Sequence, residues 1–186
     1  MFIQTETTPN PATLKFLPGR DVLPEASVNF IAAADAEASP LASRLFTVPG
    51  VEGVFLGADF VTVTKAGTRD WTELKPALLG AIMEHFMTGL PVMTSSPAAV
   101  DGADEQYDPA DRELVLQIKE LIDTRVRPAV AQDGGDIVFR GFDRGVVLLH
   151  MQGSCAGCPS STATLRYGIE NMLKHYVPEV TEVRAV

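Results

Sequence analysis

Gly153-Ser154-Cys155-Ala156-Gly157-Cys158-Pro159-Ser160-Ser161 contains both cysteines of this 186-residue chain. Residues 146–151 before it have the β-branched and apolar composition of a strand. Pro159 suits the first position of a helix, which makes Cys158 the expected N-cap residue. Apolar residues at helical spacing follow it, namely Leu165, Ile169, Met172, Leu173 and Tyr176. The stretch therefore predicts a strand, a tight loop with two thiols and a helix, in that order.

The surrounding sequence predicts the rest of a small layered domain. Residues 137–142 form a second strand, joined to residues 146–151 by the turn Asp143-Arg144-Gly145. A helix with one apolar face starts after Asp108-Pro109, and we expect it to end near Pro128. Residues 180–186 are the last predicted strand. Helices would cover one sheet, which is an α+β arrangement.

A second domain is predicted ahead of this one. It consists of strands at residues 2–6 and 14–17, a short helix at 40–46, a hairpin from 51–56 and 60–64, and a helix that carries Leu74, Leu78, Ile82 and Phe86. The segment between the two is rich in Pro, Ser, Gly and acidic residues and has no periodicity. We therefore predict two small α+β domains, residues 1–90 and 109–186, joined by a flexible linker at 91–108.

Composition limits the classes of partner. The chain has 15 basic and 24 acidic residues, a net charge of -9 and no basic cluster, which disfavours nucleic acid and anionic membranes. Residues 74–93, the most apolar long stretch, include Lys75, Pro76, Glu84 and His85, so we expect no membrane span. The first residues have no basic region followed by an apolar run, so no secretory signal is expected. A reducing compartment is expected for a chain with two cysteines in this setting.

The Cys155 and Cys158 pair allows several kinds of chemistry. A thiolate at a helix N-terminus is stabilised, and Gly153 and Gly157 let the loop fold tightly, so both sulfurs can face one small volume. The pair could be a dithiol redox couple, although no parallel βαβ pattern surrounds it. It could also be half of a four-thiolate metal site, either zinc or iron-sulfur, completed by a second chain across a twofold axis. His85, His150 and His175 are interpreted as packing or surface residues.

Several motifs together resemble the NifU/Nfu family of iron-sulfur scaffold proteins. The second half carries Asp133-Gly134-Gly135-Asp136-Ile137, the cysteine stretch, Thr164-Leu165 and Gly168-Ile169-Glu170. The first 90 residues, with Thr8-Pro9-Asn10-Pro11 and Leu14-Lys15-Phe16, resemble the N-terminal domain of Nfu proteins.

This resemblance implies a scaffold or carrier, not an enzyme. Cys155 and Cys158 would be the ligands of a [4Fe-4S] cluster held between two subunits of a homodimer. The partners would be a cluster donor and the apo-proteins that receive the cluster. Because residues 1–6 do not resemble a transit peptide, a cytoplasmic location is expected. The alternative function is a dithiol/disulfide oxidoreductase that uses the same two cysteines.

Overall fold

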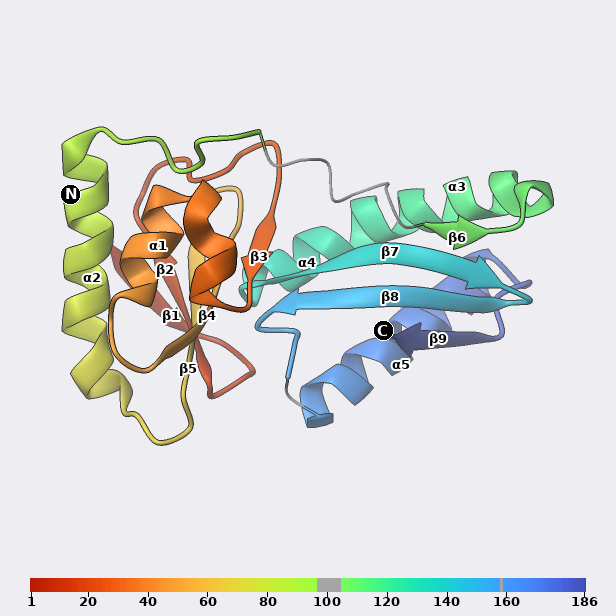
Figure 1. The fold of residues 1–186 in the computed structure, drawn as a ribbon. Helices are drawn as coiled ribbons and strands as arrows, with labels where there is room; N and C mark the ends of the chain where they lie inside the picture. Colours follow the sequence, from red (N-terminus) through yellow and green to blue (C-terminus); the bar gives the residue numbers. More distant parts are fainter. Residues whose placement is uncertain (97–104, 158) are drawn as a thin grey trace. The chain divides into compact units, whose positions relative to one another are not determined.

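Two β-sheets organise the described part of the chain, residues 1–96, 105–157 and 159–186, in the computed structural model (Figure 1). The chain divides into two units, Met1–Ala98 and Ala99–Val186, and each has its own apolar core. Helices and strands are mixed in both units, so the predicted α+β class is confirmed.

The first unit is an antiparallel sheet packed with helices. Its strands are β1 (Gln4–Thr7), β2 (Thr13–Leu17), β3 (Val28–Phe30), β4 (Val51–Leu56) and β5 (Val61–Lys65), in the order β1-β2-β5-β4-β3. Its helices are η1 (Ala33–Ala38), α1 (Pro40–Phe46) and α2 (Trp71–Thr88). The Asp70 side chain accepts from the Thr72 backbone N–H at 3.0 Å and so caps α2 at its N-terminus. Leu74, Leu78 and Ile82 of α2 are buried, as their spacing predicts.

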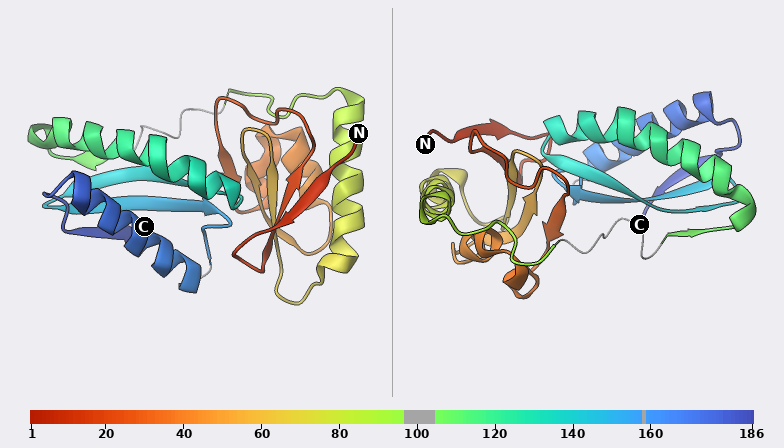
Figure 2. Two further views of the ribbon diagram at one scale, coloured as in Figure 1. Left: turned by 180° about the vertical axis from the view of Figure 1, so that it is seen from behind. Right: turned by 90° about the horizontal axis from the view of Figure 1, so that it is seen from above.

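The second unit has a four-stranded sheet with its helices on one face (Figure 2). Its elements are β6 (Gln106–Tyr107), η2 (Pro109–Asp111), α3 (Arg112–Leu121), η3 (Ile122–Val126), α4 (Arg127–Gln132), β7 (Gly135–Asp143), β8 (Val146–Gly153), α5 (Pro159–Tyr176) and β9 (Glu182–Ala185). β7 and β8 form an antiparallel hairpin, and β6 and β9 add to its two sides in parallel. The core lies between this sheet and the helices.

The turn between β7 and β8 agrees with the sequence prediction. Arg144 has φ 49° and Gly145 has φ 87°, and two successive positive values are typical of the type I′ turn that closes two-residue hairpins. The turn sets the register of the hairpin, which places Asp143 opposite Val146 at one end and Gly135 opposite Gly153 at the other.

The prediction that the helix ends near Pro128 is wrong. Helical backbone continues from Arg112 to Gln132 through the π-helical turn η3. In this turn the Arg127 backbone N–H bonds to the Ile122 carbonyl, five residues back. The wider turn precedes Pro128, which has no N–H to donate, so the chain accommodates the proline without ending the helix.

Both ends of the predicted linker (residues 91–108) are described, whereas residues 97–104 lie outside the described part. At one end, the Ser39 hydroxyl donates to the Val92 carbonyl at 2.7 Å, and the Thr94 N–H donates to the Ala38 carbonyl at 2.8 Å. At the other end, β6 pairs with β7. These described residues are thus held to the unit on their own side.

No helix in the described residues is both long and apolar enough to cross a membrane.

Candidate functional site

The cysteine-bearing loop joins β8 to α5 at one end of the second sheet (Figure 1). Its two glycines, Gly153 and Gly157, have φ values of 62° and 78°. Glycine adopts such values without steric cost, so the chain turns sharply on both sides of Cys155. α5 begins at Pro159, as predicted. Cys158 lies outside the described residues, so its predicted capping role and the meeting of the two sulfurs stay predictions.

Cys155 is buried and its sulfur faces the first residue of β7. The residue is 7% exposed and belongs to the apolar core of the second unit. A Cβ atom added at Gly135 would lie 2.5 Å from the Cys155 Sγ and 2.9 Å from the Gln152 carbonyl oxygen. Only a residue without a side chain leaves room for the sulfur here. Gly135 therefore determines where the Cys155 sulfur can lie.

Ser154 ties the cysteine loop to the turn that precedes β7. Its hydroxyl donates to the Asp133 carbonyl, and its backbone N–H donates to the Gly134 carbonyl at 3.2 Å. On the other side of the loop, the Thr162 hydroxyl of α5 donates to the Cys155 carbonyl at 3.0 Å. The loop is thus attached to both β7 and α5, and the turn Asp133-Gly134-Gly135-Asp136 has a structural task beyond reversing the chain.

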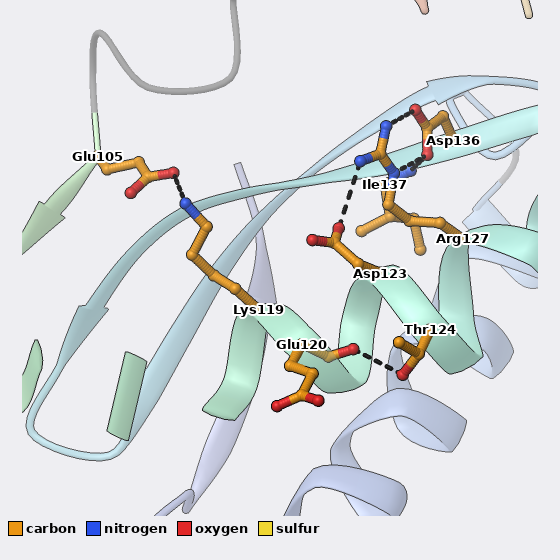
Figure 3. Close-up of polar contacts among 8 residues, drawn as sticks. All are labelled: Glu105, Lys119, Glu120, Asp123, Thr124, Arg127, Asp136 and Ile137. Carbon is orange, nitrogen blue, oxygen red and sulfur yellow. Dashed lines mark hydrogen bonds and ion pairs between the residues drawn. The ribbon is translucent and has the colours of Figure 1, made fainter. Parts of the chain in front are cut away.

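An ion-pair network holds the same turn from the helix side (Figure 3). The Arg127 guanidinium binds Asp136 through two hydrogen bonds of 2.9 Å, and it also contacts Asp123 at 3.3 Å. The Asp136 side chain is 8% exposed, and its Oδ1 also accepts from the Ile137 backbone N–H at 2.8 Å. Bidentate pairing with Asp136 raises the pKa of the Arg127 guanidinium. The sequence signal for part of this network is the spacing of four residues between Asp123 and Arg127, which places the two side chains on one helix face.

Burial makes the Cys155 thiol a weak acid. It raises the pKa of the thiol to about 11, and the negative charges of Asp133 and Asp136 act in the same direction. A hydrogen bond with Ser154 opposes this shift. The cysteine that the structure describes is therefore protonated at neutral pH, unlike a thiolate at a helix N-terminus.

The described contacts of the histidines are with residues outside the cysteine loop. His85 is buried within α2, and His150 Nδ1 is 2.9 Å from the Val186 carbonyl oxygen. His175 makes an edge contact with the Tyr176 ring. In the described residues, no group of three or more His, Cys, Asp and Glu side chains could hold a metal ion.

Comparison with protein families matches both units. Residues 3–89 match the model "Scaffold protein Nfu/NifU N terminal", and residues 118–184 match "NifU-like domain". The NifU-like match includes the cysteine loop, the turn before β7 and Arg127.

Relatives match over the whole chain. The protein named "NFU1 iron-sulfur cluster scaffold homolog, mitochondrial" is 52% identical in Drosophila sechellia and 50% identical in Homo sapiens, and both alignments cover 100% of this chain. The chain spans 65% of the length of the Drosophila relative and 72% of the human one. A solution structure of a NifU-like protein from Saccharomyces cerevisiae is 29% identical over 52% of this chain and 87% of its own, with a TM-score of 0.47.

The comparisons also correct one expectation. The cytoplasmic location expected from the sequence is contradicted, because the relatives that align with the entire chain are named mitochondrial proteins. The oxidoreductase alternative is not favoured, since these relatives are named as scaffolds. With both family models matched and relatives of about 50% identity along its full length, the chain belongs to the Nfu family of iron-sulfur cluster scaffold proteins.

Proposed function

We propose that this protein is a carrier that holds a [4Fe-4S] cluster between two copies of itself and passes it to apo-proteins. The observation that carries the proposal is the fixed position of Cys155, between Gly135 of β7 and Thr162 of α5, in the loop that also contains Cys158. Cys155 and Cys158 are the proposed ligands, and residues 109–186 the proposed cluster-binding domain. The cluster is cargo in this function, not a resident cofactor.

The number of thiols supports a shared cluster. The chain has two cysteines in all, whereas four thiolates commonly hold an iron-sulfur cluster. Two copies related by a twofold axis would supply four. Cysteine is also the soft ligand that iron-sulfur clusters prefer.

Transfer in this proposal is ligand exchange. A thiolate of the acceptor forms a bond to iron as the bond between iron and Cys155 or Cys158 breaks, and the departing thiolate takes up a proton. Repeating the exchange moves the cluster, and no electron is gained or lost. The burial of the Cys155 thiol favours its protonated form, which assists release.

Anaerobic reconstitution with iron and sulfide tests the proposal. We expect a brown dimer with one [4Fe-4S] cluster per two chains, identified by Mössbauer spectra and by mass in solution. Cys155→Ser and Cys158→Ser should each abolish stable loading and leave the circular dichroism spectrum unchanged, because the fold does not depend on a disulfide. A full cluster on the double variant would contradict the ligand assignment.

The same preparation separates the other two hypotheses. Metal analysis of protein purified without oxygen would reveal a zinc dimer instead of a cluster. A colourless monomer that catalytically reduces disulfides would support the oxidoreductase and contradict the carrier.

A further inference from the structure

The second unit has a cavity of about 540 Å³ beside the cysteine loop. It is lined by Gly157, Thr162, Ala163, Arg166, Glu182, Arg184 and Ala185. Gly157 belongs to the loop itself, and Thr162 holds the Cys155 carbonyl through its hydroxyl. An occupant of this cavity would therefore lie next to the proposed cluster ligands.

One cation in the cavity already holds a carboxylate. Arg184 donates to both oxygens of Glu182, through Nε at 2.8 Å and through a terminal nitrogen at 3.1 Å. This contact lowers the pKa of the Glu182 carboxyl, so Glu182 is ionised at neutral pH. The Arg184 and Glu182 pair is thus electrically close to neutral.

The second cation of the cavity, Arg166, differs from Arg184 in its contacts. Arg166 is exposed on α5 and makes no hydrogen bond or ion pair with any residue that the structure describes. The charge of Arg166 contributes to the lowered pKa of the Glu170 and Glu182 carboxyls. The hydrogen bonds that these two carboxylates accept from side chains come from Lys174 and Arg184 instead. The guanidinium of Arg166 is therefore available as a two-pronged donor to a carboxylate from outside.

The geometry points to this cavity, with Arg166 as its anchor, as a docking site for an acidic segment of the protein that receives the cluster. The inference rests on the proposed carrier function, because only an acceptor needs to lie beside the cysteine loop. The cavity volume lies within the roughly 300–1,000 Å³ typical of sites for small molecules, so it has room for side chains of a short peptide segment.

The net charge of the lining matches one carboxylate side chain. Glu182 neutralises Arg184, which leaves about one positive charge at the cavity, that of Arg166, and a single carboxylate balances it. The chain as a whole carries -9, so an acidic segment is attracted locally at Arg166 against an overall repulsion. Such a site sets the orientation of the partner and the rate of encounter more than the affinity.

The test is a titration of the cluster-free full chain, labelled with ¹⁵N, with two synthetic peptides. The probe is acetyl-(Glu-Gly)₄-amide and its uncharged control is acetyl-(Gln-Gly)₄-amide. At low salt we expect the glutamate peptide to shift the amide signals of Thr162, Ala163 and Arg184 and the Nε–H signal of Arg166, and the glutamine peptide to leave them in place. Raising the salt from 20 to 200 mM should weaken the binding at least about fivefold, because the contact is exposed.

Arg166→Gln should weaken binding of the glutamate peptide at least about fivefold. Arg144→Gln is the matched control: its side chain is 94% exposed, and it lies in the turn at the opposite end of the β7–β8 hairpin from the cysteine loop. We expect less than a twofold effect for it. Equal losses in both variants, or shifts spread over the whole surface, would overturn the proposal. Inorganic phosphate that shifts the same signals when the peptide does not would also overturn it.

Cluster loading of the unaltered protein is measured in parallel, which keeps the two proposals apart. A protein that loads a cluster and ignores the glutamate peptide contradicts the docking site alone. A protein that binds the peptide at Arg166 and never holds a cluster supports the acidic-segment site and contradicts the carrier function.

Discussion

Gly135 and Cys155 are packed so closely that the sulfur of one occupies the space where the other would carry a side chain. A methyl group at residue 135 would lie 2.5 Å from the Cys155 Sγ and 3.0 Å from its backbone nitrogen. Gly135→Ala should therefore displace the cysteine loop and lower the free energy of unfolding of the second unit by about 1–3 kcal/mol. Hydrogen exchange of the β7 and β8 amides measures the stability, and iron content after reconstitution measures the loading, which should fall.

Gly168→Ala is the matched control for this substitution. Gly168 lies within α5, and a Cβ there would meet nothing within 4 Å. Alanine is the better helix former by about 1 kcal/mol, so this variant should be stabilised and should load normally. If Gly135→Ala loads as well as Gly168→Ala, the contact between Gly135 and Cys155 does not position the ligand.

The pairing of Arg127 with Asp136 should matter more than its pairing with Asp123. Asp136→Asn leaves a guanidinium without its bidentate partner at a site where the acid is 8% exposed, which should cost about 1–3 kcal/mol. The Asp123 side chain is 55% exposed, so Asp123→Asn should cost about 0.5 kcal/mol or less. Amide exchange at Ile137, whose N–H bonds to Asp136, reports the difference. Equal losses of stability in the two variants would mean that the buried pair of Arg127 with Asp136 stabilises the fold no more than the exposed pair with Asp123.

His85 should make the first unit sensitive to acid. Burial lowers the pKa of its ring, and the charge of Arg44 acts in the same direction. The unfolded chain takes up a proton near the ordinary value of 6.5, whereas the folded unit resists it to lower pH. The stability that this residue contributes is therefore complete above pH 6.5 and is lost as the pH falls below it.

The single tryptophan, Trp71, begins α2 and reports unfolding of this unit by fluorescence. Urea midpoints at pH 7.5 and pH 5.5 should differ more for the unaltered protein than for His85→Phe, in which the ring cannot be charged. An equal pH dependence in the two proteins would assign the effect to other groups.

The Cys155 thiol should react slowly in the folded, cluster-free protein. With a pKa raised from 9.0 to about 11, its thiolate fraction at pH 8 is about 100-fold smaller than in the unfolded chain. Iodoacetamide labelling at pH 8, read by peptide mass spectrometry, should therefore be at least about tenfold slower at Cys155 in the native protein than in guanidinium chloride. Equal rates in the two solvents would show that the thiol is not shielded.

Local sequence signals predicted the elements whose formation depends on neighbouring residues. The α1 helix has the predicted bounds, Pro40–Phe46, because Ser39 caps it and Pro40 starts it. The hairpin turn at Arg144 and Gly145 is also predicted by local sequence, because Asp143-Arg144-Gly145 contains the residue types that favour a tight turn. The short strands β3 and β6 were not predicted, because each is held by a partner strand distant in the sequence.

Around the candidate site, the sequence pointed to the cysteine pair, whose role as ligands stays a prediction, but not to the tertiary contacts that hold Cys155 in place. The cysteine spacing and Pro159 are visible in the sequence, and the start of α5 follows from them. The contact of Gly135 with Cys155 and the pairing of Arg127 with Asp136 depend on tertiary packing, which no local pattern encodes. The path of the chain past Pro128 depends likewise on a π-helical turn that no local signal predicted.

The parallel pairing of β8 with β9 affects the order in which the second unit acquires its structure. The β7–β8 hairpin closes through two residues, whereas β9 reaches β8 only after the chain has crossed over through α5. Hairpins close in microseconds and pairings between distant segments form later. Until β9 pairs with β8, the packing that buries Cys155 is incomplete, so we expect this thiol to be most exposed early in refolding. Reductant added at the start of refolding, before iron and sulfide, should therefore protect it from oxidation.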